Sequence, residues 1–297
     1  MAAVAPVPAA NKTLPPELQK LLGRISEIGS LPEVTARIVE TVENPNSTAR
    51  DVHDAVRNDP ALATKLLKVV NSAFYGLPAQ VASLERAILM LGLSAVKNLA
   101  LAASLSGFVK SGAVCDRFDA RDLWRHSVAV AACARLLATR TKVVPLEEAF
   151  VAGLVHDLGL IVVHQLLAPQ MRTIAEQCLT TAQSYVAAET AALGADHQQF
   201  GAALAARWKF PPLLRHAIAY HHDPDTLQPE HRKSAVFVKI ADTLCCQAQY
   251  GYWLTAHTQV VTAEDLALVG LSAPVVEELL QILPERVAET EAIFADL

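Results

Sequence analysis

The feature that most constrains the fold of this chain is an apolar stretch at residues 149–168, which is about as long as a bilayer is thick. The stretch contains His156, Asp157 and His164, and Glu148 lies at its edge. A buried carboxylate is costly unless it is hydrogen-bonded or bound to a cation. The stretch therefore predicts a core helix of a soluble protein, in which His156 and Asp157 need polar or metal partners.

The composition around this stretch favours helices throughout. Ala, Leu and Val dominate, whereas aromatic residues, which strands favour, make up 5% of the chain. A hydrophobic share of 52% can fill a large core. We predict an all-α fold.

Caps and breakers give the predicted helix bounds. Thr48 and Asp51 form a capping-box pattern, and Asp59 precedes a proline at the first helical position. The first third is predicted to form helices at residues 14–28, 32–44, 48–58, 60–76 and 83–105, the last with Gly92 inside it. Further helices are predicted at residues 121–141, 145–167, 168–193, 196–208, 211–221, 232–250, 262–270 and 273–296.

Two glycines and several polar residues interrupt the helical pattern at residues 107–120, where we place a subdomain boundary. The predicted organisation is a flexible tail at 1–13, an N-terminal helical subdomain at 14–110 and a second helical subdomain at 111–297.

Charge and cysteine usage restrict the possible partners and compartment. The net charge is −5 without a run of Lys or Arg, which argues against direct nucleic-acid binding, and we expect no membrane partner. The N-terminus lacks the basic region of a signal peptide. Five cysteines without CxxC spacing, Cys245 and Cys246 included, predict no disulfide framework, so we expect a cytoplasmic protein.

Several histidines and aspartates occupy positions where helical periodicity predicts burial. Asp122 and His126 are four residues apart on one inward-facing stripe, and Asp242 lies on another. Five histidines and three aspartates share this property: Asp122, His126, His156, Asp157, His197, His221, His222 and Asp242.

This set favours a metal site. Imidazoles and carboxylates suit iron, manganese or zinc, and five or six of them could hold one or two ions. A single buried His-Asp pair is more often an ordinary hydrogen-bonded pair, so only the combination points to metal.

The order of these residues resembles the HD superfamily of metal-dependent phosphohydrolases. The segments "SLPEVTARIVETVENP", "RNDPALATKLLKVVNSAFYG" and "AILMLGLSAVKNLAL" are similar to signatures of the HDOD family, the HD-related output domains of bacterial signalling proteins. The resemblance implies a helical N-terminal subdomain packed on an HD-like helical bundle. It also implies that His126, His156, Asp157 and Asp242 form the metal-binding core, and that Asp122, His197, His221 and His222 complete a two-metal site.

Three departures from the related HD-GYP phosphodiesterases bear on catalysis. Asp122 stands where those enzymes usually have glutamate, and Leu160 where they have a phosphate-binding lysine. The segment "HHDPDTLQPEH" lacks their Gly-Tyr-Pro motif. Phosphodiester cleavage needs a positioned, charge-compensated substrate as well as metal.

Two functions remain open at this point. The first is a non-catalytic signalling output or adaptor module that retains its metal site and binds a signalling protein or a nucleotide. The alternative is a metal-dependent phosphohydrolase acting on a nucleotide or cyclic dinucleotide. A DNA-binding regulator has little support, because the candidate recognition helices carry only two cationic groups each.

Overall fold

The computed structural model describes residues 14–24, 33–44, 46–56, 59–72, 75, 77, 79–105 and 112–294. Within these ranges the chain forms helices and one isolated β-bridge, between Ala113 and Asp119, which confirms the all-α prediction. The predicted tail at 1–13 and residues 107–111 of the predicted boundary lie outside the described residues.

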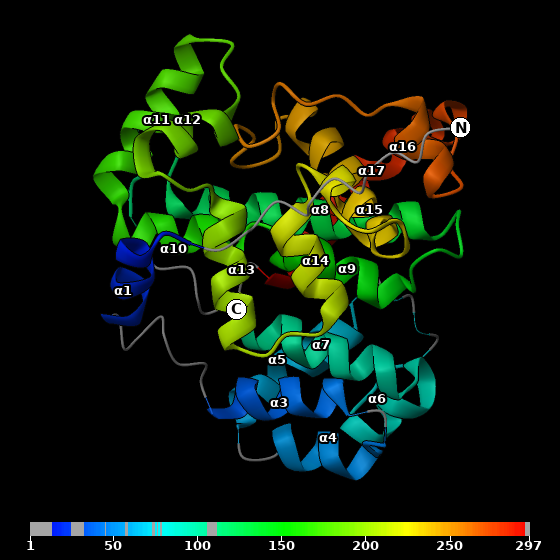
Figure 1. Ribbon diagram of the computed structural model, residues 1–297. Helices are drawn as coiled ribbons and strands as arrows, with labels where there is room; N and C mark the ends of the chain where they lie inside the picture. The colour runs from blue at the N-terminus through cyan, green and yellow to red at the C-terminus, as the bar shows by residue number, and fades with distance from the viewer. Residues whose placement is uncertain are drawn as a thin grey trace, which may run out of the picture.

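The N-terminal part forms a layer built around one helix, α7. In the sequence, α1 (Pro16–Arg24) precedes this layer. The layer consists of α3 (Glu33–Glu43), α4 (Ala49–Val56), α5 (Pro60–Val70), α6 (Leu84–Leu91) and α7 (Leu93–Leu105). Helices α3 to α6 all contact α7, of which nine of 13 residues are buried (Figure 1). The predicted helix starts are confirmed, since Asp51 accepts a hydrogen bond from the Thr48 backbone N–H and Asp59 from that of Leu62.

Three predicted helices are divided in the structure, two of them outside the apolar stretch. The prediction of one helix at 83–105 is wrong because Gly92 has φ +88°, a conformation that separates α6 from α7. The predicted helix at 168–193 is likewise divided into α11 (Ala168–Thr180) and α12 (Tyr185–Leu193), because the backbone at Thr181 is extended.

The second part is a bundle around α8. Its helices are α8 (Ala120–Ala138), α9 (Leu146–Val155), α10 (Leu158–Leu166), α11, α12, α13 (His197–Arg207), α14 (Pro212–Tyr220), α15 (Arg232–Gln247), α16 (Ala263–Leu268) and α17 (Ala273–Phe294), with short 3-10 turns η2 (Pro224–Thr226) and η3 (Pro229–His231). Helix α8 contacts α9, α10, α15 and α17. Its small side chains allow close packing: a Cβ on Gly153 of α9 would lie 2.8 Å from the Val130 carbonyl oxygen.

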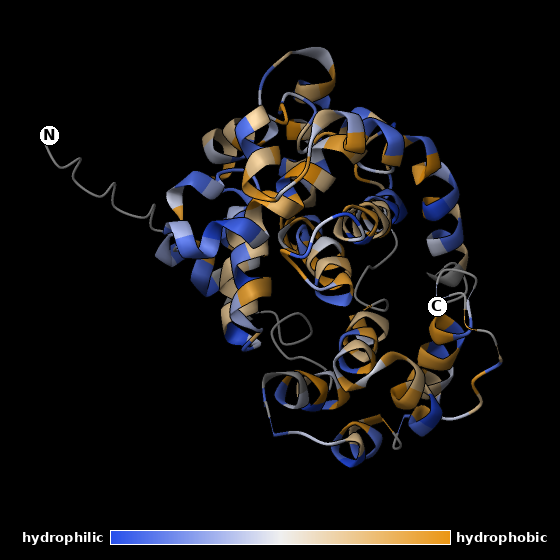
Figure 2. Ribbon diagram, turned by 90° about the vertical axis from the view of Figure 1, so that its right-hand side faces the viewer, coloured by the Kyte–Doolittle hydropathy of each residue, from blue (hydrophilic) through white to orange (hydrophobic). Residues whose placement is uncertain are grey.

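The apolar stretch that constrained the fold runs through the centre of this bundle as α9 and α10. Residues Leu146–Leu166 are the one segment of the described chain long and apolar enough to cross a membrane. In its most apolar stretch of 18 residues, 83% is buried inside the protein. The interior helices are mostly tan to orange in Figure 2, whereas hydrophilic segments lie outside. The segment therefore packs in the protein core, as predicted, but as two helices and not one.

The layer and the bundle share one buried core, through contact of α7 with α9. A polar link runs beside this contact. The Tyr75 hydroxyl donates a hydrogen bond of 2.5 Å to Glu147, which also accepts one of 3.3 Å from Arg135 Nε. The Arg135 guanidinium lies 4.9 Å from the centre of the Tyr75 ring, so the three side chains form one interlocked contact.

Candidate metal centre

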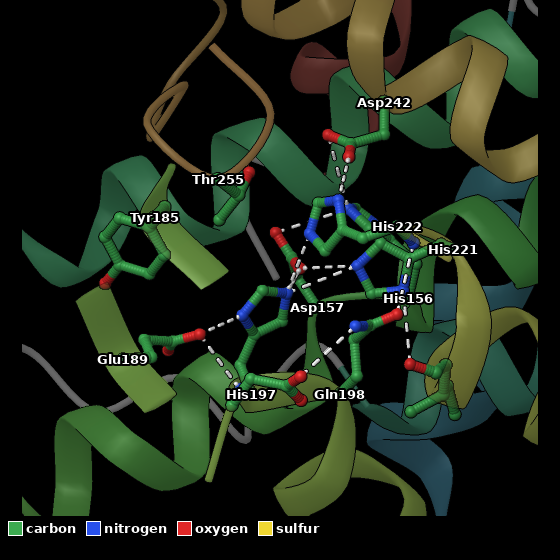
Figure 3. A network of polar contacts seen from close by, with 12 residues as sticks. His156, Asp157, Tyr185, Glu189, His197, Gln198, His221, His222, Asp242 and Thr255 are labelled. Atoms are coloured by element: carbon green, nitrogen blue, oxygen red, sulfur yellow. Dashed lines mark hydrogen bonds and ion pairs between the residues drawn. The ribbon is translucent and has the colours of Figure 1, made fainter. Parts of the chain in front are cut away.

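Seven of the eight predicted ligand residues converge at one buried place in the bundle, and all but His126 are labelled in Figure 3. They come from α8, from the junction of α9 and α10, from the first residue of α13, from the end of α14 and from α15. The seven are His126, His156, Asp157, His197, His221, His222 and Asp242.

A break in the apolar helix aims two adjacent side chains at the same place. In a continuous helix neighbouring residues point about 100° apart. Here α9 ends before His156, Asp157 leaves the helical conformation (φ −94°, ψ 20°), and α10 begins at Leu158. The prediction of one helix at 145–167 is therefore wrong at its centre. As a result, His156 Nε2 and Asp157 Oδ2 lie 3.2 Å apart.

Two glycines bring His197 beside this break. A Cβ on Gly159 of α10 would lie 2.7 Å from the His197 carbonyl carbon and 2.8 Å from Gly201 N. A Cβ on Gly201 of α13 would likewise overlap the Ile218 side chain. The absence of a side chain at Gly159 lets α10 and α13 cross so closely, which places His197 at the centre, and glycine at position 201 leaves room for Ile218 of α14.

All five histidines use Nδ1 in a hydrogen bond directed away from the centre. Four of the acceptors are oxygens of the Tyr250, Gly153 and Ala217 carbonyls and of the Glu189 carboxylate, and the fifth is the Gln259 side-chain oxygen. Because these oxygens can only accept, each Nδ1 must carry a proton. In the neutral tautomer each Nε2 therefore presents a lone pair.

The Nε2 atoms gather around the two oxygens of Asp157. Oδ1 lies 3.4 Å from Nε2 of both His197 and His221, and the Nε2 atoms of His197 and His222 are 3.0 Å apart. Oδ2 lies 3.2 Å from His156 Nε2 and 3.7 Å from His126 Nε2. Asp157 thus divides the centre into two halves and faces both.

The donor set fits divalent metal ions. His156 Nε2, both oxygens of Asp157 and Asp242 Oδ2 are buried without a hydrogen-bond partner. Converging lone pairs and carboxylates repel one another unless cations lie among them. Two ligands bound at about 2.1 Å to one ion are about 3.0–3.4 Å apart, which matches the separations around Oδ1. One ion in each half would satisfy these atoms.

Burial and neighbouring charges have opposite effects on several pKa values within the metal-free centre. Burial raises the pKa of Asp157, but the neighbouring histidines, His156 foremost, outweigh it and hold that pKa well below its usual value. Burial lowers the pKa of His197, but the Glu189 carboxylate more than compensates, so that the pKa is about 9. For His222 burial dominates and the pKa lies well below its usual value.

Metal affinity is expected to rise with pH. With its pKa at about 9, His197 is protonated at neutral pH in the metal-free protein, and a metal ion must displace that proton from Nε2. Each proton displaced strengthens apparent binding by about tenfold per pH unit up to that pKa. Competition with a chromophoric chelator between pH 6 and 9 measures this slope. A flat profile over that range would contradict a site that includes His197.

Comparison with known proteins agrees with this geometry. The family model of the HDOD domain matches residues 28–224. The chain belongs to the HDOD family. The match covers the N-terminal layer and most of the bundle, and it includes six of the seven converging residues: His126, His156, Asp157, His197, His221 and His222. Asp242 lies beyond the matched range.

Relatives of this HDOD chain have similar folds. A Treponema pallidum protein of unassigned function is 29% identical over 204 residues, which are 67% of this chain but 38% of that protein, so this chain spans well under half of its relative. An HDOD protein of unknown function from Geobacter sulfurreducens is 22% identical with a TM-score of 0.79, covering 93% of this chain and 96% of its own. A Shewanella amazonensis SB2B protein, provisionally named a phosphohydrolase, is 25% identical with a TM-score of 0.71, covering 92% and 97%.

The structure does not bring Asp122 to the other seven residues. Its carboxylate instead accepts a hydrogen bond of 2.8 Å from the Asp119 backbone N–H, and the two aspartates form a capping box at the start of α8. Asp122 Oδ1 also lies 3.8 Å from Arg125. The short side chain of Asp122 thus caps the N-terminus of α8.

Three residues of the HDOD centre were missed by sequence reasoning. Glu189 binds His197, Gln259 binds His222, and Cys246 lies 3.3 Å from Asp242 Oδ1. The sequence carries a weak signal for two of them: Glu189 lies one turn after Tyr185 on the buried side of α12, and Cys246 one turn after Asp242 on α15. Gln259 lies in an irregular segment and has no such signal.

The segment at residues 250–259 closes the centre. The Tyr250 carbonyl accepts a hydrogen bond from His126, and Gln259 contacts both the side chain and the backbone of His222. Between them lies Thr255 (Figure 3), which is buried and whose Oγ1 lies 3.5 Å from Cys246 Sγ. His126, His156, His197, His221 and Asp242 are 0% exposed, and Asp157 is 3% exposed.

Proposed function

We propose that this chain is a cytoplasmic signalling module that holds one or two divalent metal ions in its buried centre and acts by binding another protein. The observation that carries the proposal is the closure of the centre. Six of the seven converging residues are at most 3% exposed and the side chain of His222 is 7% exposed, and two of the seven are hydrogen-bonded to residues 250–259, so this conformation offers a phosphodiester little access to the centre.

The environment of the centre further supports a non-catalytic role. Phosphate recognition needs positive charge near the metal. Among the described residues no Lys or Arg forms an ion pair with the seven. Leu160, at the position where the related phosphodiesterases have lysine, is 1% exposed and packs in the core.

The metal would be held by His126, His156, Asp157 and Asp242 in one half and by Asp157, His197, His221 and His222 in the other. Iron, manganese and zinc all accept such ligands. The bound ions would neutralise the converging carboxylates and lone pairs, and so stabilise the crossing of α8, α10, α13 and α15.

Two observations support a protein partner in the cytoplasm. On α6 of the N-terminal layer, Leu89 is 83% exposed and Met90 is 39% exposed, and such apolar groups on a surface favour protein contacts. All five cysteines are free thiols, which fits a reducing compartment.

A metal-dependent phosphohydrolase is the second candidate. The seven converging ligand residues in two halves favour it, since such a set can activate a water molecule, and so does the provisional name of the Shewanella relative. It requires residues 250–259 to open so that a nucleotide or cyclic dinucleotide can reach the centre.

One assay separates the two candidates. The protein is loaded anaerobically with iron, manganese or zinc, its metal content is measured, and it is incubated with cyclic dinucleotides and a chromogenic phosphodiester. The His156→Ala, Asp157→Ala double variant is the control. We expect metal in the wild type only and no turnover above that of the double variant. Turnover that requires both residues would overturn the non-catalytic proposal.

A further inference from the structure

A buried glutamate outside the predicted ligand set holds one of the histidines. Glu189 on α12 is 0% exposed, and its Oε2 accepts two hydrogen bonds from His197, one of 3.0 Å from the backbone N–H and one of 2.5 Å from Nδ1 (Figure 3). Its other oxygen, Oε1, has no hydrogen-bond partner.

We propose that Glu189 is a positioning residue that orients His197 toward the metal and strengthens it as a ligand, an inference that rests on the proposed metal centre. A carboxylate that accepts the Nδ1 proton fixes the tautomer with a lone pair on Nε2 and makes that nitrogen more basic. His197 is the only one of the five histidines whose Nδ1 partner is a carboxylate.

The cost of this arrangement argues against a merely structural role. A buried carboxylate with one unsatisfied oxygen destabilises a fold that could place an apolar residue there. Helix α12 has few buried side chains, namely Tyr185, Ala188 and Glu189, and packs mainly on α11. Two of these three contact the centre or the segment that closes it. Glu189 binds His197, and Tyr185 accepts a hydrogen bond of 2.8 Å from Tyr252 in the closing segment.

The location of Glu189 predicts that its effect is confined to one half of the centre. His197 belongs to the group with His221, His222 and Asp157 Oδ1, whereas His126 and Asp242 lie in the other half. Loss of the carboxylate should therefore weaken one ion and leave the other in place.

The test compares Glu189→Gln and Glu189→Leu with wild type, with Glu147→Gln as matched control. Glu147 is likewise hydrogen-bonded, although its side chain is 14% exposed, and it binds Tyr75 and Arg135 away from the centre. Zinc affinity is measured by chelator competition, and the stability of the chelated proteins by urea unfolding. We expect Glu189→Gln to bind one of the zinc ions about 10- to 100-fold less tightly than wild type does. Glu189→Leu should bind that ion less tightly still, and Glu147→Gln should bind zinc like wild type.

A double-mutant cycle and NMR separate the possible failures. If Glu189 acts through His197, Glu189→Gln adds no further loss of zinc affinity in a His197→Ala background. In metal-free protein with ¹⁵N-labelled histidine, a protected His197 Nδ1–H resonance is expected in wild type and lost in Glu189→Leu. Persistence of that resonance in Glu189→Leu, or equal zinc affinity of Glu189→Gln and wild type, overturns the role of Glu189. A wild type without metal instead contradicts the metal centre itself.

Discussion

Asp157→Asn is expected to reduce the metal affinity of both halves of the centre by more than about 100-fold, since changes to groups that merely orient ligands already cost about 10- to 100-fold. Asp157 is the one residue with an oxygen in each half: Oδ1 faces His197 and His221, and Oδ2 faces His156. The amide removes the negative charge and points N–H groups at nitrogen lone pairs. Elemental analysis of protein purified without chelator measures the change.

The loss of metal has to be distinguished from unfolding. In metal-free protein the neighbouring histidines hold the pKa of Asp157 well below its usual value, so the ionised carboxylate contributes stability at neutral pH that Asp157→Asn removes. Metal content is therefore compared under conditions in which circular dichroism shows that both proteins are folded. Asp122→Asn is the matched control. Asp122 was also predicted as a ligand, but it accepts a hydrogen bond from the Asp119 backbone N–H, and the asparagine oxygen can do the same. Normal metal content in Asp157→Asn, or loss of metal in Asp122→Asn, would show that the ligands have been assigned incorrectly.

Gly159→Ala is expected to destabilise the protein by about 3 kcal/mol or more, at the upper end for overpacked cores. The added methyl group would overlap the His197 carbonyl group and approach Gly201 N to 2.8 Å, and both are backbone atoms that cannot rotate away. Separation of α10 from α13 would also move His197 away from Asp157. Thermal unfolding should show a midpoint lowered by about 6–12 °C, together with reduced metal content.

A second glycine provides the control. At Gly194 a Cβ has no neighbour within 4 Å, but φ is +74°, so Gly194→Ala introduces backbone strain without a clash. It should cost about 1 kcal/mol and leave metal binding intact. Similar costs for the two variants would mean that α10 and α13 can separate without penalty.

Most of the fold could be predicted because helix starts depend on local chemistry. Asp59 and Pro60 begin α5 as expected, since capping and proline geometry involve only neighbouring residues. The breaks at Gly92 and after Asp157 were not predicted. A glycine inside a helical pattern is compatible with either continuation or a turn, and the break after Asp157 lies in an uninterrupted apolar run where periodicity gives no signal.

Ligand residues of the centre could be predicted where they lie on the inward-facing stripe of a helix. His126 and Asp242 followed from helical spacing, and the structure brings them within 3.0 Å of each other. Asp122 lies on the same stripe as His126 but in the first turn of α8, where a capping role competes with any other. Glu189 was missed because its role depends on how the hairpin of α11 and α12 docks, which no local pattern records.

The closure formed by residues 250–259 also affects how fast a bound ion would exchange with solvent. An ion bound there would exchange more slowly when the hydrogen bonds of Tyr250 and Gln259 are closed, so its residence time would depend on the frequency of their opening as well as on coordination strength. An ion captured while the chain folds would then be replaced slowly by another metal.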